Sequence, residues 1–95
     1  MIPDFCIKDK VIVVTGGAGA ICGTMCRTFG EAGAKVAVLD LRQDFAQKIA
    51  DEITAKGGQA IGVACNVLEK DSIEAAAEIV MQQWYRVDVL INGAG

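Results

Sequence analysis

The sequence predicts an α/β fold, in which a parallel β-sheet has helices packed on both faces. Short runs of β-branched and other apolar residues alternate with longer segments in which apolar residues recur every three or four positions. The connections between these segments are short, so consecutive strands are expected to run parallel with a helix crossing between them. Four such runs and three helical segments fit into the 95 residues in the order βαβαβαβ. The pattern therefore predicts one small domain.

Four apolar runs are the expected strands, at 11–14, 35–39, 60–64 and 87–91. The first run, 11–14, is a continuous β-branched stretch, which is typical of a strand that is buried on both faces of a sheet. Glycines follow the first two helical segments and are expected to end them. The residues expected to face the core are Ile21, Met25, Phe29 and Ala32 in the first helix, Phe45, Ile49 and Ile53 in the second, and Ile73, Ala76, Ala77, Val80 and Trp84 in the third.

The charge balance excludes two classes of partner. The chain has 9 basic and 12 acidic residues, a net charge of −3 and an isoelectric point near 4.7. Nucleic acids and anionic membranes attract clustered Lys and Arg, and here the basic residues are scattered. No apolar run approaches the roughly 20 residues that span a bilayer, and the start of the chain shows no signal peptide. We therefore expect a cytoplasmic protein that binds neither nucleic acid nor membrane.

The four cysteines, Cys6, Cys22, Cys26 and Cys65, lie in or beside apolar segments. They form no Cys-x-x-Cys pair, and the chain has no histidine. Zinc usually requires four Cys or His ligands at tight spacings, although Cys22 and Cys26 could share one face of a helix. We therefore predict no metal site and interpret the cysteines as small buried thiols in a reducing compartment.

A glycine cluster lies between the first expected strand and the first expected helix. Gly16 is expected to form the tight turn, and Gly17 and Gly19 to let the backbone approach a pyrophosphate at the helix N-terminus. Glycines also collect in turns for conformational reasons alone. However, Asp40 follows 24 positions after Gly16, at the end of the next strand, where a carboxylate can accept hydrogen bonds from ribose hydroxyls. Together these features predict a Rossmann-type dinucleotide-binding fold.

Two other nucleotide-binding classes can be compared with this pattern. The loop lacks the Lys-Ser or Lys-Thr pair of a P-loop, so the chain is not expected to be an NTPase of that class. A fold that binds S-adenosylmethionine, as in methyltransferases, shares the sequence of strand, glycine loop, helix and acid. That class remains the structural alternative.

Three motifs resemble those of the short-chain dehydrogenases/reductases. Residues 14–23 resemble the Thr-Gly-x-x-x-Gly-x-Gly loop of that family, and residues 90–95 resemble its Asn-Asn-Ala-Gly signature after the fourth strand. Asn66-Val67 stands where the family has Asp-Val after the third strand. The resemblance covers essentially the whole chain, and three motifs at matching intervals are more specific than any one of them.

The resemblance implies NAD as cofactor and a role for each matching residue. Ile21 would face the cofactor, Asp40 would select the ribose, and Asn66 and Val67 would flank the adenine, with Asn66 offering a carbonyl acceptor. Asn92, Ala94 and Gly95 would line the path of the nicotinamide-side ribose. The family also implies a small alcohol or ketone as substrate and a homodimer or homotetramer. The expected cofactor-binding residues are Thr15, Gly16, Gly17, Gly19, Ala20, Ile21, Asp40, Leu41, Asn66, Val67, Asn92, Ala94 and Gly95.

Three positions depart from the family pattern. Ala20 and Cys22 stand where the family usually has its second and third glycines, and Gly93 replaces the second Asn of the fourth-strand motif. An extra methyl at Ala20 is expected to narrow the approach to the pyrophosphate, and a thiol at Cys22 to widen the contact between helix and strand. Cys22 and the Asn-Gly-Ala-Gly ending are similar to the hexuronate branch, the D-mannonate (fructuronate) oxidoreductases, which implies a sugar acid as substrate.

No catalytic residue is predicted within the chain. In the family, the catalytic Ser and Tyr-x-x-x-Lys follow the motif with which this sequence ends at Gly95, and Tyr85 has no Lys four residues on. We therefore expect 1–95 to be the N-terminal, dinucleotide-binding portion of a single Rossmann-fold domain without its catalytic portion. The chain alone is expected to be inactive. A dinucleotide-binding fragment with no catalytic role is the alternative.

Overall fold

The computed structural model describes residues 7–17 and 19–93. Its elements follow the predicted order βαβαβαβ. Most strands begin and end within one residue of the predicted positions. The elements are β1 (Val11–Thr15), α1 (Ala20–Glu31), β2 (Lys35–Asp40), α2 (Gln43–Ala55), β3 (Gln59–Ala64), α3 (Lys70–Trp84) and β4 (Val89–Asn92).

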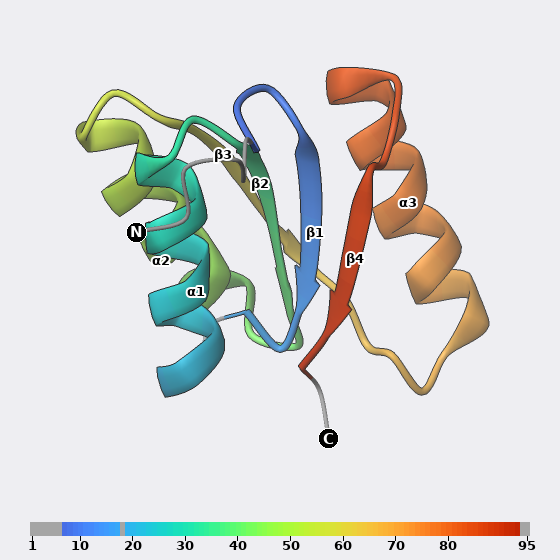
Figure 1. The fold of residues 1–95 in the computed structure, drawn as a ribbon. Coiled ribbons are helices and arrows are strands. Elements are labelled where there is room, and N and C mark those ends of the chain that lie inside the picture. Colours follow the sequence, from blue (N-terminus) through green and yellow to red (C-terminus); the bar gives the residue numbers. More distant parts are fainter. Residues whose placement is uncertain (1–6, 18, 94–95) are drawn as a thin grey trace.

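The four strands form one parallel sheet in the order β3-β2-β1-β4. Helices α1 and α2 cover one face and α3 covers the other, which confirms the predicted doubly wound α/β fold (Figure 1). In the register, Thr15 lies beside both Leu39 of β2 and Asn92 of β4. The carboxyl ends of β1, β2 and β4 therefore meet at one edge of the sheet, which is where parallel α/β sheets bind their ligands.

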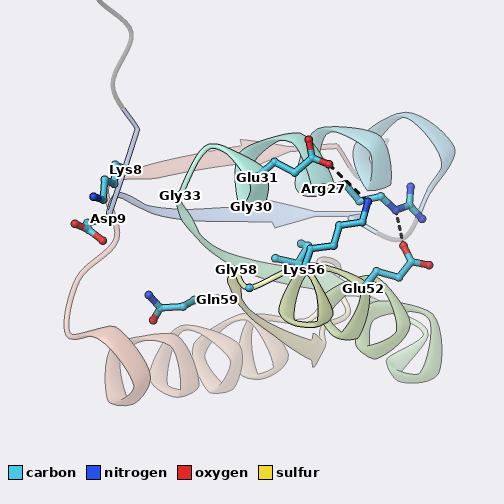
Figure 2. Close-up of a pocket in the computed structure, with 12 residues that line it drawn as sticks. Lys8, Asp9, Arg27, Gly30, Glu31, Gly33, Glu52, Lys56, Gly58 and Gln59 are labelled. Atoms are coloured by element: carbon cyan, nitrogen blue, oxygen red, sulfur yellow. Dashed lines mark hydrogen bonds and ion pairs between the residues drawn. The ribbon is translucent and has the colours of Figure 1, made fainter.

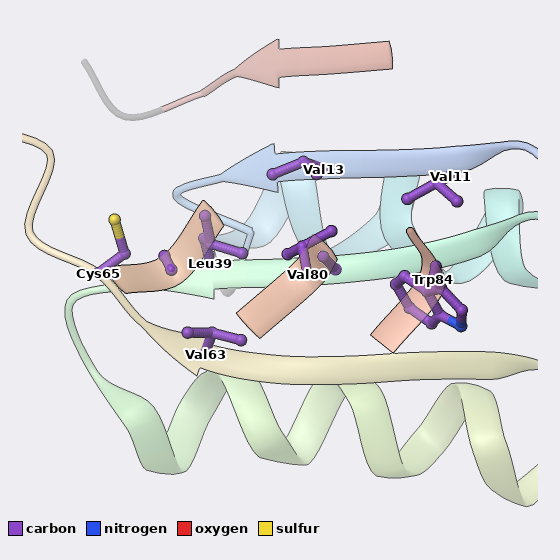
Figure 3. Packing of buried hydrophobic residues seen from close by; sticks show 9 residues of the cluster. Val11, Val13, Leu39, Val63, Cys65, Val80 and Trp84 are labelled. Atoms are coloured by element: carbon purple, nitrogen blue, oxygen red, sulfur yellow. The ribbon is translucent and has the colours of Figure 1, made fainter. Parts of the chain in front are cut away.

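The core has two layers, one on each face of the sheet, because successive residues of β1 point to opposite sides. On the α3 side, Val11 and Val13 pack with Leu39 of β2 and with Val80 and Trp84 of α3 (Figure 3). The two helical positions were predicted to face the core, and they do. The buried residues of the other layer include Ile12, Val14, Val36, Val38, Cys26 and Ile49.

The expectation that the larger apolar residues of α1 face the core holds only in part, because Phe29 packs against the buried cluster whereas Ile21, which was also expected to face the cofactor, is exposed. Ile21 is 79% exposed, and the buried residues of α1 are Gly23, Cys26 and Gly30. Helix α1 lies so close to α2 that a methyl group on Gly30 would come within 2.5 Å of Ile53 Cγ2. Small residues form the contact face because only they allow this approach, and the larger apolar residues lie to its sides. Phe45 of α2 and Ile73 of α3, also expected in the core, are partly exposed at 42% and 45%.

Strand β4 begins two residues later than predicted, because the side chain of Asp88 replaces a backbone partner at its start. The Asp88 backbone N–H donates to the Val11 carbonyl at 2.9 Å, and the Val11 N–H donates to Asp88 Oδ2 at 2.8 Å. A carboxylate thus takes the place of a strand carbonyl at this end of the ladder. Within the described ranges, 7–17 and 19–93, the outer edge of β4 has no partner strand, and Leu90 is 65% exposed. No helix in those ranges is long and apolar enough to cross a membrane.

Candidate functional site

Thr15, Asp40 and Asn92 end three neighbouring strands, and the sheet brings them to the same edge. The Thr15 hydroxyl donates a hydrogen bond to Asn92 Oδ1 at 2.9 Å. Two residues far apart in the sequence are therefore joined at this edge, as the parallel register requires. The predicted site residues Ala94 and Gly95 lie outside the described residues.

The loop after β1 is a tight turn that depends on glycine. Gly16 has φ of 67°, in the left-handed region that glycine adopts without strain. The Gly19 N–H donates to the Gly16 carbonyl at 3.1 Å, and the Gly17 N–H donates to the Leu39 carbonyl at 3.0 Å. These bonds hold the turn against the end of β2, next to Asp40.

Gly17 is buried, and its small size serves the packing of the core. A methyl group there would lie 2.8 Å from Val38 Cγ1 and 3.4 Å from Cys26 Sγ. Gly19, in contrast, is exposed at the start of α1. Of the two glycines expected to approach a pyrophosphate, Gly19 lies on the surface where a ligand could reach it. The proposed contact at Gly17 stays a prediction.

The N-terminus of α1 has no compensating negative charge. Gly19 is its N-cap, no described side chain caps it, and no acidic residue lies in its first turn. The other two helices each have an acidic residue there, Asp44 in α2 and Asp71 in α3. Backbone N–H groups and the helix dipole give such an end a partial positive charge. The end of α1 that adjoins the glycine turn is therefore suited to an anionic group such as a pyrophosphate.

Asp40 ends β2 and is held by its own loop. Its backbone carbonyl accepts from the Cys65 N–H at 2.8 Å, and its Oδ1 accepts from the Arg42 N–H at 3.1 Å. The Arg42 guanidinium stacks on the Phe45 ring, 3.8 Å from its centroid. The nearest cationic group along the chain is thus stacked on an aromatic ring of α2.

A cavity of about 310 Å³ lies between this carboxylate and the loop after β3. Leu41 and Leu68 contribute to its walls and are 68% and 90% exposed. Two exposed leucines beside a carboxylate provide apolar surface for a flat ring and hydrogen-bond acceptors for a sugar. The residues that line the cavity are Gly16, Asp40, Leu41, Cys65, Asn66, Val67 and Leu68.

Asn66 and Val67 both line the cavity, where adenine contacts were predicted. The Asn66 side chain stabilises its own turn, because its Oδ1 accepts from the Leu68 N–H at 3.0 Å. The Asn66 N–H in turn donates to Ser72 Oγ at 2.8 Å. The carbonyl acceptor expected to face adenine is therefore already engaged once, although an amide oxygen has a second lone pair.

Sequence reasoning missed Leu68, Cys65 and Ser72 at this site. Leu68 carries the only readable signal, because it is a large apolar residue placed beside Asn66-Val67 and just before the polar start of α3. Cys65 lines the cavity because β3 ends one residue earlier, and Ser72 acts through a hydrogen bond. Neither role is visible without the fold.

Another cavity, of about 270 Å³, lies at the opposite, amino-terminal end of the strands, around the C-terminal ends of α1 and α2 (Figure 2). Its charged residues pair with one another, Arg27 with Glu52 at 2.5 Å and Lys56 with Glu31 at 3.6 Å. The pKa of Glu52 lies below its usual value because of its hydrogen bond to Arg27. This cavity lies far from the strand ends that carry the predicted site residues.

Cys26 is fully buried, and burial raises the pKa of its thiol to about 12. A thiol of this kind stays protonated and acts as a packing residue, as predicted. Cys65 is also buried, and Cys22 is half-buried. In the part of the chain that the structure describes, no group of three or more His, Cys, Asp or Glu residues could hold a metal ion.

The parallel sheet in the order 3-2-1-4, the glycine turn, the uncompensated helix end and the carboxylate after β2 define a Rossmann-type nucleotide-binding protein. A family model described as short chain dehydrogenase matches residues 10–95. The chain belongs to the short-chain dehydrogenase family, as its motifs predicted.

Curated relatives and solved structures agree with this assignment. The chain is 45% identical over 89 residues to an uncharacterized oxidoreductase, UxuB, of Bacillus subtilis, covering 94% of this chain and 32% of the relative. A hydroxysteroid dehydrogenase from Escherichia coli superposes with a TM-score of 0.90 at 34% identity, over 94% of this chain and 38% of that structure. A provisionally assigned D-mannonate oxidoreductase from Haemophilus influenzae, solved with bound NAD, also reaches 0.90, at 35% identity, over 94% of this chain and 32% of that one. The chain thus spans about a third of the length of these relatives.

Proposed function

We propose that this chain forms the cofactor-binding part of an NAD-dependent oxidoreductase that transfers hydride between the nicotinamide and a small alcohol or ketone. The observation that carries the proposal is the pairing of two opposite features across one glycine turn. One is the uncompensated positive end of α1, and the other is the carboxylate of Asp40 beside a cavity with exposed leucines. Together they match a molecule that is anionic in the middle and carries an adenosine at one end.

Each part of the cofactor has residues that would bind it. The backbone at Gly19 and the first turn of α1 would receive the pyrophosphate, and Asp40 would accept hydrogen bonds from the adenosine ribose. Leu41 and Leu68 would contact the adenine. Asn92, tied to β1 by the hydrogen bond from Thr15, would lie along the path to the nicotinamide. When bound, the nicotinamide supplies the hydride donor or acceptor, and these residues orient it.

We propose NAD rather than NADP. A phosphate on the 2′-hydroxyl would bring close to two negative charges toward the Asp40 carboxylate. Such a phosphate would require a cation, and Arg42 is stacked on Phe45. The neighbouring loop residues, Gly16, Gly17 and Gly19, carry no charge. The solved relative from Haemophilus influenzae with bound NAD supports the same choice.

The substrate of the whole protein is a narrower proposal. Similarity to the provisionally assigned D-mannonate oxidoreductase, together with Cys22 and the Asn-Gly-Ala-Gly ending, favours a sugar acid such as fructuronate or mannonate. The chain's only tyrosine, Tyr85, directly follows α3 as its C-cap, is 82% exposed and is followed by no Lys four residues on. We therefore expect the chain alone to bind the cofactor without turnover.

The test is a titration of the isotopically labelled chain with NAD, followed by amide chemical shifts. Shifts should concentrate at Gly16, Gly19 and Leu68, and should be small at Gly30 and Gly58 beside the opposite cavity. The matched titration uses S-adenosylmethionine, which shares the adenosine but lacks the pyrophosphate. Saturable shifts with S-adenosylmethionine and none with NAD would overturn the proposal. Steady NADH consumption by the purified chain would contradict the expected lack of turnover.

A further inference from the structure

Two of the three positions that depart from the family pattern lie against each other. Cys22 belongs to the first turn of α1, and Gly93 directly follows β4. A methyl group built on Gly93 would overlap the Sγ of Cys22, whereas the Cys22 Cβ would remain at an ordinary contact distance of 3.6 Å. The missing side chain at Gly93 thus provides the space that the thiol fills.

The backbone of Gly93 does not itself require glycine. The positive-φ glycines of the described residues are Gly16, Gly33 and Gly57, and Gly93 is not among them. An alanine could adopt its conformation, so the space around it decides which residue fits. Besides the thiol, the other close neighbour is the Thr15 carbonyl, which would lie 2.9 Å from the added methyl.

This contact lies at the site described above. The Gly93 N–H donates to the Thr15 carbonyl at 3.0 Å, and the preceding residue is Asn92, whose Oδ1 accepts from the Thr15 hydroxyl. The Cys22 side chain therefore separates the first turn of α1 from the end of β4. Its size determines how closely a pyrophosphate site on α1 and a nicotinamide site on β4 approach each other.

We infer that Cys22 and Gly93 are a size-matched pair that sets the distance between the two halves of the dinucleotide site. The inference rests on the proposed function of that site. Cys22 acts as a positioning residue, because its thiol contacts the end of β4 rather than the reacting atoms. A side chain at 93 would force the thiol into another rotamer, which a helix restricts, or would move the end of β4 away from α1.

The test is a double-mutant cycle on the whole chain, with Gly93→Ala, Cys22→Ala and the double variant. Cys22→Ala removes Sγ but keeps the Cβ, its gain in helix propensity is shared by the single and double variants, and the Thr15 carbonyl is the same in all four proteins. NAD affinity is measured by calorimetric titration, and stability by urea unfolding. Gly93→Ala should weaken NAD binding about tenfold more when Cys22 is present than in the Cys22→Ala background, since residues in contact show coupled effects and the contact with the Thr15 carbonyl adds the same loss to both.

The control is Cys22→Ser combined with Gly93→Ala. Serine keeps an atom at the γ position, so this variant should recover little of the affinity, whereas a general effect of losing the thiol would make it behave like the alanine double variant. Equal losses from Gly93→Ala in both backgrounds would overturn the inference. If the parent chain fails to bind NAD, the proposed function is wrong. The unfolding data then still test whether Cys22 and Gly93 are matched in size. If the change in unfolding free energy of the double variant equals the sum of the two single changes, the size-matched contact is refuted. A double variant that is more stable than this sum predicts would support it.

Discussion

The substitution Gly17→Ala separates packing from ligand contact in the glycine turn. The new methyl group would lie 2.8 Å from Val38 Cγ1, 3.1 Å from the Val14 carbonyl and 3.4 Å from Cys26 Sγ. The carbonyl belongs to the central strand, and Val38 and Cys26 are fully buried, so little around the methyl can move. Overpacking of this kind typically costs about 1–3 kcal/mol. In a domain of this size each kcal/mol lowers the melting temperature by roughly 4–8 °C.

Gly19→Ala is the matched control. Among the described residues its methyl group would meet only the Gly16 carbonyl, at 3.4 Å, and the φ of Gly19 is −68°, which alanine tolerates. Because Gly19 is the N-cap of α1 and alanine is a poorer N-cap residue than glycine, the unfolding free energy should fall by about 0.5–1 kcal/mol, which is less than the overpacking cost expected for Gly17→Ala. NAD affinity should fall by on the order of tenfold, because the methyl lies where the backbone would approach the pyrophosphate. Thermal melts and NAD titrations measure both. A stable Gly17→Ala variant that loses NAD affinity, beside a Gly19→Ala variant that keeps it, would refute the reasoning.

Four further outcomes are expected. Asp88→Asn should destabilise the chain at neutral pH and flatten its acid sensitivity in urea melts at several pH values. The hydrogen bond from Arg86 holds the pKa of Asp88 below its usual value. The ionised Asp88 side chain therefore stabilises the folded state above about pH 4, and this contribution is lost as pH falls through the lowered pKa. Phe45→Leu should release Arg42 and improve NADP affinity by about two- to fivefold in titrations, with NAD affinity unchanged. Cys26→Ala should cost about 1–2 kcal/mol in urea unfolding and leave NAD affinity nearly unchanged. Sedimentation velocity should show self-association that grows with concentration, because the apolar edge of β4 has no partner strand within the described residues; a monomer at all concentrations would contradict this.

The order of the elements could be predicted because short apolar runs alternate with segments of helical spacing, and glycines mark the ends of the first two helices. The buried face of α1 could not. Counting apolar residues at helical spacing selected Ile21, whereas the contact with α2 is so close that glycines and Cys26 occupy it. Spacing identifies a helix, but the distance to its neighbour decides which residues fit between them.

The same division holds for the site. Asp40 and Asn92 were each predicted at the end of a strand, and the parallel sheet brings these strand ends to the same side. Leu68 and the contact between Cys22 and Gly93 were not predicted. The residues of that contact are distant in the sequence, and their proximity follows only from how α1 packs beside β4. The sequence showed both substitutions without showing that one makes room for the other.

The central claim is that the carboxyl edge of this sheet binds NAD through Asp40. The most direct test measures the affinity of the chain for NAD and for NADP at one ionic strength, and then repeats both with Asp40→Ser. The parent should bind NAD at least about tenfold more tightly, because hydrogen bonds to a charged group contribute about 1.5–3 kcal/mol and the same charge repels a 2′-phosphate. The difference should shrink in the variant. Equal affinities in the parent, unchanged by Asp40→Ser, would contradict the account.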